Sequence, residues 1–284
     1  MQDWIDETSP RRRGAPRPPR FPGRAGHLAL SILAFALAAG PPAARAQGAD
    51  PHAVQPERPT VATHAFTVAP GWVEIEAGVE RDRYGDRTVG ATAPVEVKVG
   101  LTPHLQLDLD GSLVHLPATG VTGFGDLALG LKWHAAGGLP LVGDLALLGV
   151  LKAPTAPTAS GLGTGTSDVA LVLISSHRFG DFSLDVNAGW TRRSGSGARV
   201  PRSANLWTVS VGGPAIGALG WTAEVYGYPG TAGPAGAAPI VAVLGGPTLL
   251  ARRYLAFDAG LIAPLAGPQP RAVYCGAVWN VGRL

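Results

Sequence analysis

Apolar and polar side chains alternate along most of this 284-residue chain, and this period of two constrains the fold more than any other feature. In Leu127–Trp133, Leu, Leu, Leu and Trp stand at every second position, separated by Ala, Gly and Lys. Because successive side chains of a strand point to opposite faces, such a segment places one row on each face. The same alternation occurs in residues 73–80, 95–99, 105–110, 182–190, 207–211 and 255–261.

The number and spacing of these segments predict an all-β membrane barrel. Less regular segments at 144–152, 167–175, 220–228, 239–246 and 271–281 raise the count to about twelve strands. A tilted strand of about 9–11 residues crosses a bilayer, and single-chain bacterial barrels have an even number of strands. The 40 Gly and 26 Pro suit the turns of such a fold and exclude a helix bundle. We therefore predict a transmembrane antiparallel up-and-down β-barrel with both chain termini in the periplasm.

The composition of the two rows indicates which row faces lipid. A barrel surrounded by water would need dense charge outside, yet only three Lys follow residue 47, and the polar rows hold many Gly, Ala, Ser and Thr. Rows of Leu, Val, Phe and Trp fit a lipid-facing surface, and the small and acidic rows fit a narrow, wet lumen. Every strand must then be paired, since an open edge leaves backbone groups unsatisfied in hydrocarbon. A secreted soluble β-barrel that binds a ligand is the alternative.

The first 46 residues have the pattern of an export signal. A basic stretch precedes the apolar run Leu28–Ala39, and Ala44–Ala46 has the A-x-A form of a cleavage site. The run is shorter than the roughly 20 residues of a spanning helix, although an uncleaved anchor is the alternative. We expect residues 1–46 to be a cleaved signal peptide, 47–65 a flexible lead-in and 66–284 a barrel in the cell outer membrane.

The basic charge of the chain belongs to this leader. Seven Arg and three acidic residues lie in 1–46, so residues 47–284 carry 16 Lys and Arg against 17 Asp and Glu. The pI of about 9.3 is therefore no indication of nucleic-acid binding, and we expect no nucleic-acid partner.

Carboxylates dominate the row assigned to the lumen. Such a surplus favours cations and neutral solutes over anions, as acidic rings do in channels. The alternative is a plugged interior in which carboxylates pair with Lys and loop Arg side chains, because twelve strands enclose less space than the sixteen of a large porin. The predicted lumen-lining residues are Glu74, Glu76, Glu96, Lys98, Asp108, Asp110, Asp126, Lys132, Asp168, Asp185, Glu224 and Asp258.

Short connections alternate with longer ones along the chain. Gly100–His104, His134–Pro140 and Ser176–Gly180 are predicted periplasmic turns, and longer segments such as 81–88 and 192–203 would face outward. Guanidinium groups pair bidentately with phosphate, so we expect the outward arginines to contact lipopolysaccharide, with solvated loop charges as the alternative. These residues are Arg81, Arg83, Arg87, Arg192, Arg193, Arg199 and Arg202.

Several tryptophans fall near predicted strand ends, where aromatic rings form girdles at the membrane interfaces. The competing interpretation, an aromatic ligand cage, would need several of the rings to point inward. The predicted girdle consists of Trp72, Trp133, Trp190, Trp221 and Trp279.

No arrangement of residues indicates catalysis or metal binding. Ser175–His177 lies close to Asp181 in sequence, but neighbours on one turn do not form a catalytic triad, and no G-x-S-x-G motif occurs. The histidines lack ligand spacing, and the single Cys275 excludes a CxxC site. We predict that the protein is not an enzyme and uses no metal or cofactor.

Six segments carry a family resemblance: Phe66–Gly78, Gly123–Trp133, Gly149–Thr155, Gly163–Asp168, Leu184–Trp190 and Gly220–Gly227. In this order they resemble the meta-pathway phenol-degradation-like outer-membrane family, over about residues 66–284. The resemblance implies an outer-membrane β-barrel associated with the passage of small, often aromatic, compounds. One departure is Val278–Leu284, which lacks the terminal aromatic residue expected of an assembly signal. Either Leu284 substitutes for it, or assembly is less efficient.

These observations predict an outer-membrane channel for the passive passage of small solutes, hydrophobic or aromatic compounds among them. The expected partners are membrane lipid, lipopolysaccharide, a small-molecule solute and the barrel-assembly machinery. A closed barrel with a structural or surface-recognition role is the alternative. If the facing is right, Leu129→Arg costs about 2–4 kcal/mol whereas Asp126→Asn barely affects folding.

Overall fold

The computed structural model describes residues 50–194, 203–228 and 239–284, to which all structural statements below refer. Within these ranges no helix has the length and apolar character needed to cross a membrane. One 3-10 turn, η1, spans Thr158–Ser160. The strands are β1 (Trp72–Tyr84), β2 (Arg87–Thr102), β3 (Leu105–Leu116), β4 (Val121–Phe124), β5 (Leu127–Leu139), β6 (Gly143–Ala153), β7 (Asp168–Phe179), β8 (Phe182–Arg193), β9 (Ser203–Ile216), β10 (Leu219–Tyr228), β11 (Ile240–Arg252), β12 (Leu255–Ala266) and β13 (Arg271–Arg283).

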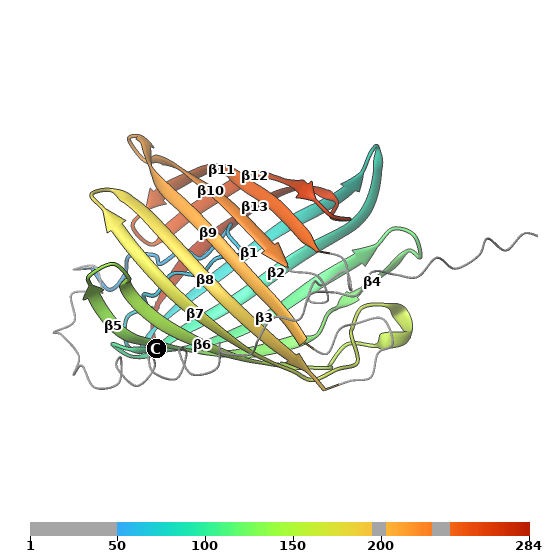
Figure 1. Ribbon diagram of the computed structural model, residues 1–284, viewed down its shortest axis with the longest axis horizontal. Coiled ribbons are helices and arrows are strands. Elements are labelled where there is room, and N and C mark those ends of the chain that lie inside the picture. The colour runs from blue at the N-terminus through green and yellow to red at the C-terminus, as the bar shows by residue number, and fades with distance from the viewer. Residues whose placement is uncertain (1–49, 195–202, 229–238) are drawn as a thin grey trace, which may run out of the picture. The chain divides into compact units, whose positions relative to one another are not determined.

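The strands form one closed antiparallel barrel. Each strand pairs with the next around the ring, and the pairing of β1 with β13 joins the first strand to the last (Figure 1). Both β4 and β5 pair with β3, so β4 continues β5 across a break at Gly125 and Asp126. The described residues therefore occupy twelve strand positions, which confirms the predicted fold class.

The two ends of the barrel differ. The connections 103–104, 140–142, 180–181, 217–218 and 253–254 are short and define what we call the turn end, where β1 begins and β13 ends. The opposite, loop end carries longer connections such as 154–167, which contains η1 (Figure 1). Strands continue through parts of the predicted turns, since β5 reaches Leu139 and β7 reaches Phe179. Ladder hydrogen bonds join backbone groups, so pairing continues where the side-chain alternation ends.

Apolar side chains of the alternating rows cover the outer surface. Leu129 and Leu171 are 47% and 46% exposed, whereas Lys98 and Lys132, from the opposite row, are fully buried. An apolar exterior around a polar interior is the arrangement of a membrane barrel, so the predicted facing is confirmed.

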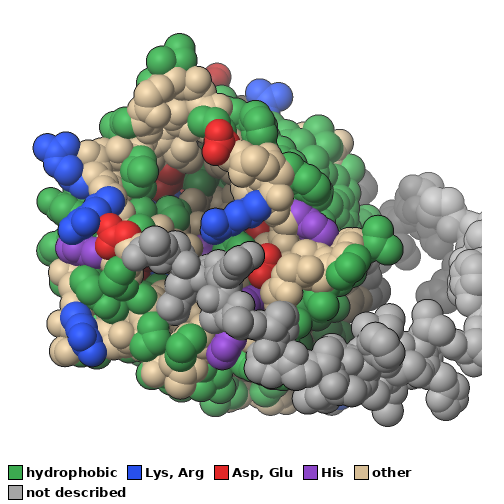
Figure 2. Space-filling model, turned by 90° about the vertical axis from the view of Figure 1, so that its left-hand side faces the viewer, with side chains coloured by type: hydrophobic (Ala, Val, Ile, Leu, Met, Phe, Trp, Pro, Cys, Tyr) green, Lys and Arg blue, Asp and Glu red, His purple; other side chains and the backbone are tan. Residues whose placement is uncertain are grey.

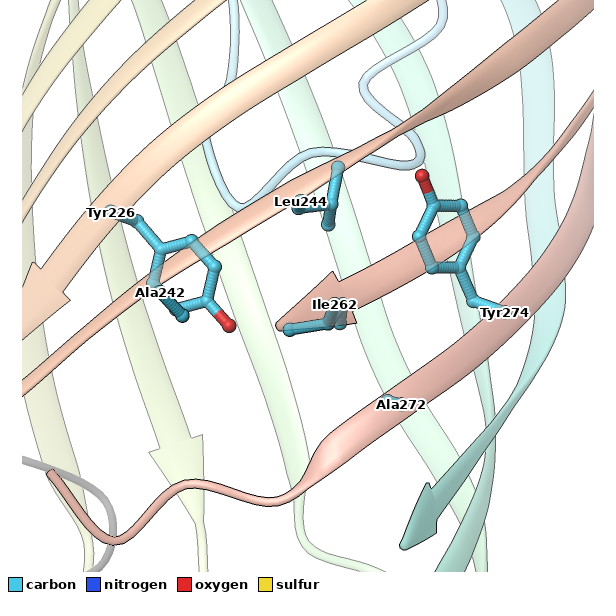
Figure 3. Packing of buried hydrophobic residues seen from close by; sticks show 6 residues of the cluster. All are labelled: Tyr226, Ala242, Leu244, Ile262, Ala272 and Tyr274. Atoms are coloured by element: carbon cyan, nitrogen blue, oxygen red, sulfur yellow. The ribbon is translucent and has the colours of Figure 1, made fainter. Parts of the chain in front are cut away.

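One part of the inward row is apolar rather than acidic. In the loop-end half of β10–β13, six buried side chains pack on the inner face (Figure 3). The prediction of small and acidic lumen residues is wrong here, because segments such as Ile240–Leu244 are apolar at every position and provide no polar row. We call this cluster the aromatic wall; it consists of Tyr226, Ala242, Leu244, Ile262, Ala272 and Tyr274.

Candidate functional site

The lumen contains residues 50–71 of the chain itself, which we call the lead segment. The segment starts at the turn end, where Asp50 pairs with Arg253 at 3.0 Å. It returns to the same end, where Pro70 forms a parallel bridge with Gly100. Figure 2 views the turn end and shows basic, acidic and histidine side chains around its mouth. The lead segment is thus a loop that enters and leaves the lumen through one end.

Side chains of the inward row accept hydrogen bonds from the backbone of the lead segment. The segment has no regular secondary structure, so its buried N–H groups need other partners. Carboxylate, amide and hydroxyl oxygens of β1, β3, β7, β8 and β10 supply them. At 2.7–2.9 Å, the pairs are Gln55 N–Glu74 Oε2, Glu57 N–Glu76 Oε1, Arg58 N–Glu76 Oε2, Val61 N–Glu224 Oε2, Ala62 N–Glu224 Oε1, Thr63 N–Asn187 Oδ1, Ala65 N–Ser176 Oγ and Val68 N–Gln106 Oε1.

These contacts differ from the sequence expectation for residues 47–65. The Pro-rich composition predicts a flexible lead-in, but the described part, 50–65, is held in the lumen by most of these hydrogen bonds. Composition reveals that such a segment lacks secondary structure; it does not reveal that strands far along the chain supply its hydrogen-bond acceptors. The lumen is therefore narrowed by the chain's own backbone as well as by paired side chains.

Lys98 is fully buried between two carboxylates of β1. Its Nζ lies 2.8 Å from Glu74 Oε1 and also contacts Glu76 Oε1. Nζ also donates a hydrogen bond to Gln55 O at 2.7 Å. Three partners compensate for the desolvation of this cation, and they connect the lead segment to the barrel wall.

Lys132 is the second buried lysine of the lumen, and its Nζ forms an ion pair with Glu57 of the lead segment. Burial raises the pKa of Glu57, but the positive charges of Lys132 and Lys98 outweigh this effect and lower the pKa to about 2. Burial lowers the pKa of the neighbouring His64 to about 3, against the opposing charge of Glu57. The neutral His64 ring accepts a hydrogen bond from Phe66 N at Nδ1, at 3.2 Å.

Arg58 extends from the lead segment to β12. Its Nε and Nη2 atoms donate to the two carboxylate oxygens of Asp258, each at 3.3 Å. Nη2 also lies 3.5 Å from Cys275 O. The predicted lumen residue Asp258 therefore holds a side chain of the lead segment.

An acidic cavity of about 310 Å³ lies against β2 and β3. Glu96 and Asp110 are register partners on these strands, and both line the cavity together with Glu76, Arg58 and Asp126. The structure thus brings four predicted carboxylates together around one space. Closely spaced like charges in a concave, low-dielectric site attract counterions of the opposite sign.

Two other predicted lumen residues bond to inward side chains. Asp108 accepts a hydrogen bond from Gln106 Nε2 at 2.8 Å, and Asp185 accepts one from Ser176 Oγ. Gln106 and Ser176 in turn accept N–H groups of the lead segment. Both aspartates therefore orient the acceptors that hold this segment.

Asp126 and Asp168 belong to the loop end. Lys152 Nζ lies 3.1 Å from Asp126 Oδ2 and 3.3 Å from Asp168 Oδ2. Asp126 also accepts the N–H groups of Ala156 and Thr164 at 3.1 and 2.9 Å. The carboxylate therefore fixes the long connection between β6 and β7, a role that strand alternation cannot reveal.

A second cavity, of about 430 Å³, lies beside the aromatic wall. Tyr226 and Tyr228 meet edge-on with their ring centroids 6.3 Å apart, and Ile262 adds an aliphatic surface. Gln269 Nε2 donates to the Tyr226 hydroxyl, while the buried Gln269 Oε1 has no hydrogen-bond partner among the described residues. An apolar cavity with few polar groups has the composition of a small-molecule site.

The arginines predicted to contact lipopolysaccharide differ in their exposure. Exposed side chains belong to Arg81, Arg83 and Arg87, at the ends of β1 and β2, and to Arg192 of β8. These ends are strand rather than loop. Arg193 is half-buried, with its Nε 3.6 Å from Asp168 Oδ2. Arg199 and Arg202 lie outside the described residues.

Four of the five predicted girdle tryptophans are exposed on the outer surface. Trp133, Trp221 and Trp279 lie toward the turn end, and Trp190 lies toward the loop end. Trp72 differs, because its ring is 4.8 Å from that of His52 in the lead segment. The predicted set therefore includes one residue that contacts the lead segment.

Sequence reasoning missed the neutral acceptors and both charged residues of the lead segment. Gln106, Ser176 and Asn187 occupy inward positions of β3, β7 and β8, and strand alternation could have identified Gln106 and Asn187 if the selection had not been limited to charge. Glu57 and Arg58 gave no comparable signal, because no periodic pattern assigns a position to an irregular segment.

No family model matches the sequence, and no curated protein matches it. Solved structures do. An outer membrane channel from Pseudomonas putida F1 is 16% identical, with a TM-score of 0.59 over 80% of this chain and 99% of that chain. The NanC porin is 6% identical, with a TM-score of 0.51 over 74% of this chain and 100% of that chain. The shared feature is the fold, that of an outer-membrane β-barrel.

Proposed function

We propose that the protein is an outer-membrane channel for the passive passage of small solutes. The observation that carries this proposal is a closed barrel with an apolar exterior and cavities inside its lumen. The fold it shares with an outer membrane channel and a porin supports the same function. Export through a cleaved signal peptide and insertion by the barrel-assembly machinery belong to this proposal.

The cavities suggest which solutes would pass. Glu96 and Asp110 line the acidic cavity with a surplus of negative charge, which favours cations and neutral molecules. Tyr226 and Tyr228 offer an apolar surface on the opposite side, which suits hydrophobic or aromatic compounds. The second preference agrees with the resemblance to the meta-pathway phenol-degradation-like family, and we propose membership of that family.

Single-channel recording in planar bilayers tests the proposed function. We expect discrete conductance steps in KCl, and a reversal potential in a salt gradient that shows preference for cations. In liposomes, glucosamine should enter faster than gluconate, which is similar in size but negatively charged. An uncharged aromatic alcohol should reduce the current more than an aliphatic alcohol of equal volume. Equal block by the two alcohols would contradict the aromatic preference alone.

A closed barrel with a structural or surface-recognition role is the second candidate, and the lead segment is the observation that favours it. Eight of its N–H groups are bonded to the wall, so the segment obstructs the lumen. Conductance no greater than that of the lipid alone would contradict the channel and support this candidate.

We also propose that the exposed arginines at the loop end contact lipopolysaccharide phosphates. Arg81, Arg83 and Arg87 lie on adjacent strands, where several guanidinium groups can bind one phosphorylated headgroup. Replacing the three by Gln should weaken lipopolysaccharide binding to the purified barrel. Unchanged affinity would exclude this contact.

A further inference from the structure

Arg58 separates two cavities of the lumen. On one side lies the acidic cavity, lined by Glu96 and Asp110. On the other lies a cavity of about 260 Å³, lined by the hydroxyl side chains of Thr222 and Thr248 among others, which we call the hydroxyl cavity. Of the residues that the structure describes, Arg58 alone lines both cavities. A solute moving between the two spaces passes its side chain.

The guanidinium of Arg58 rests on a surface without side chains. Gly78 and Gly276 are register partners on β1 and β13, and a Cβ on either glycine would overlap the guanidinium. The guanidinium can therefore occupy this position only because neither residue carries a side chain. The guanidinium is held by Asp258 at 3.3 Å, longer than the roughly 2.7–2.9 Å of a strong charge-assisted hydrogen bond.

The backbone of the same residue is fixed much more firmly. Arg58 N donates to Glu76 Oε2 at 2.8 Å, and the preceding Glu57 N donates to the other oxygen of this carboxylate. A long side chain on a fixed backbone can change rotamer without displacing the lead segment. The barrier between the cavities is thus one movable cation among carboxylates.

We propose that Arg58 forms the constriction of the channel and determines its size limit and charge selectivity. This inference rests on the proposed channel function. The guanidinium occupies the passage between the acidic and hydroxyl cavities, and its positive charge opposes the cation preference that Glu76, Glu96 and Asp110 create. Passage of a solute requires the side chain to leave Asp258 and move off the two glycines.

Conductance and reversal potential of four variants test the proposal. Arg58→Ser should raise the KCl conductance at least about twofold and increase the preference for cations, because it removes both bulk and positive charge. Arg58→Lys should retain the wild-type selectivity with a smaller rise in conductance. Gly276→Ala should raise the conductance while the arginine is still present, because the new methyl group displaces the guanidinium. Arg252→Ser removes an equal charge from an exposed side chain at the turn end, whose hydrogen bond is to the neighbouring Ala251 O, and should change neither property.

The outcomes separate the inference from the channel function. If the wild type conducts and Arg58→Ser matches it in conductance and selectivity, the assignment of Arg58 is overturned and the channel stands. If neither the wild type nor any variant conducts, the channel function fails and the assignment fails with it. Hydrogen exchange at Val61 and Ala62 provides the second readout, since Glu224 holds these amides independently of Arg58. If conductance rises only when their protection is lost, Arg58 is merely an anchor and the proposal is overturned.

Discussion

Two walls of the same lumen differ in the chemistry of their inward side chains. The acidic wall, formed by inward residues of β1–β3, carries Glu74, Glu76, Glu96, Asp108 and Asp110, and part of it binds backbone N–H groups and the Lys98 cation. The aromatic wall of β10–β13 packs rings and aliphatic side chains against one another. The difference shows that inward residues are polar where N–H groups of the lead segment need acceptors, and apolar where the Val61 side chain of that segment packs against the wall.

The largest effect is expected for Lys98→Met in the acidic wall. The change leaves Glu74 and Glu76 buried without their shared cation, which should cost about 3–5 kcal/mol of unfolding free energy. Denaturant titration of the refolded protein in micelles measures it. Lys152→Met is the matched control, because that cation is partly exposed at the loop end, and it should cost clearly less. Equal losses of unfolding free energy in the two variants would show that the buried carboxylates of the acidic wall depend on Lys98 no more than the loop-end carboxylates depend on Lys152.

If the side chains of both walls face the lumen, the alternate side chains of the same strands must face lipid. Leu129→Arg places a cation on the outer surface and should cost about 2–4 kcal/mol at mid-membrane depth. Refolding titrations into phospholipid bilayers measure this cost. A negligible cost would contradict the facing of both walls.

The aromatic wall contacts the lead segment through the Val61 side chain, so disturbing the wall should affect that segment only near Val61. Leu244→Ala removes a buried side chain beside an existing cavity, so we expect a loss of about 2–3 kcal/mol, at the low end for such truncations. Hydrogen exchange at Gln55, Glu57 and Arg58, whose amides are bound by the acidic wall, should stay as slow as in the wild type. Faster exchange there would show that the two walls are coupled rather than separate.

Acidification should affect the lead segment and leave the aromatic wall unchanged. The pKa of His64 is about 3 in the folded protein and near 6.5 in an unfolded chain, so the folded state binds fewer protons between these values. Stability of the segment therefore falls as the pH drops below 6.5, by about 1.4 kcal/mol per pH unit. Glu57, with a pKa of about 2, adds a loss in the same direction below pH 4.5.

Exchange rates of residues 57–65, corrected for intrinsic chemistry, measure this dependence. His64→Gln should flatten it between pH 6.5 and 5, because the side chain no longer titrates. An unchanged slope in that variant would assign the effect to another group.

The smallest effect concerns Asp126 at the edge of the acidic cavity. The alternation alone predicts little consequence for Asp126→Asn, but the carboxylate accepts the N–H groups of Ala156 and Thr164 and pairs with Lys152. Weakening these bonds should cost about 1 kcal/mol and accelerate exchange at both amides. Fast exchange of both amides in the wild type would contradict the role of Asp126 in fixing this connection.

Much of the fold could be predicted from particular segments. Leu127–Trp133 and Phe182–Trp190 alternate regularly, and the structure places their apolar residues outside and their polar residues inside. Ile240–Leu244 could not be assigned in this way, because both faces of β11 are apolar there. The candidate site was predicted only in part: its carboxylates stand out by charge, whereas their partners Glu57 and Arg58 lie about 20 to 200 residues away along the chain.

The sequence by itself determined that the chain forms strands and which rows meet lipid, since both follow from a period of two and the transfer of apolar side chains from water. Only the tertiary structure decided what fills the lumen. Closure of the barrel brings β1, β8, β10 and β12 around one axis, and their side chains become partners of the lead segment only through that closure. Such contacts depend on where distant strands meet, which no local pattern encodes.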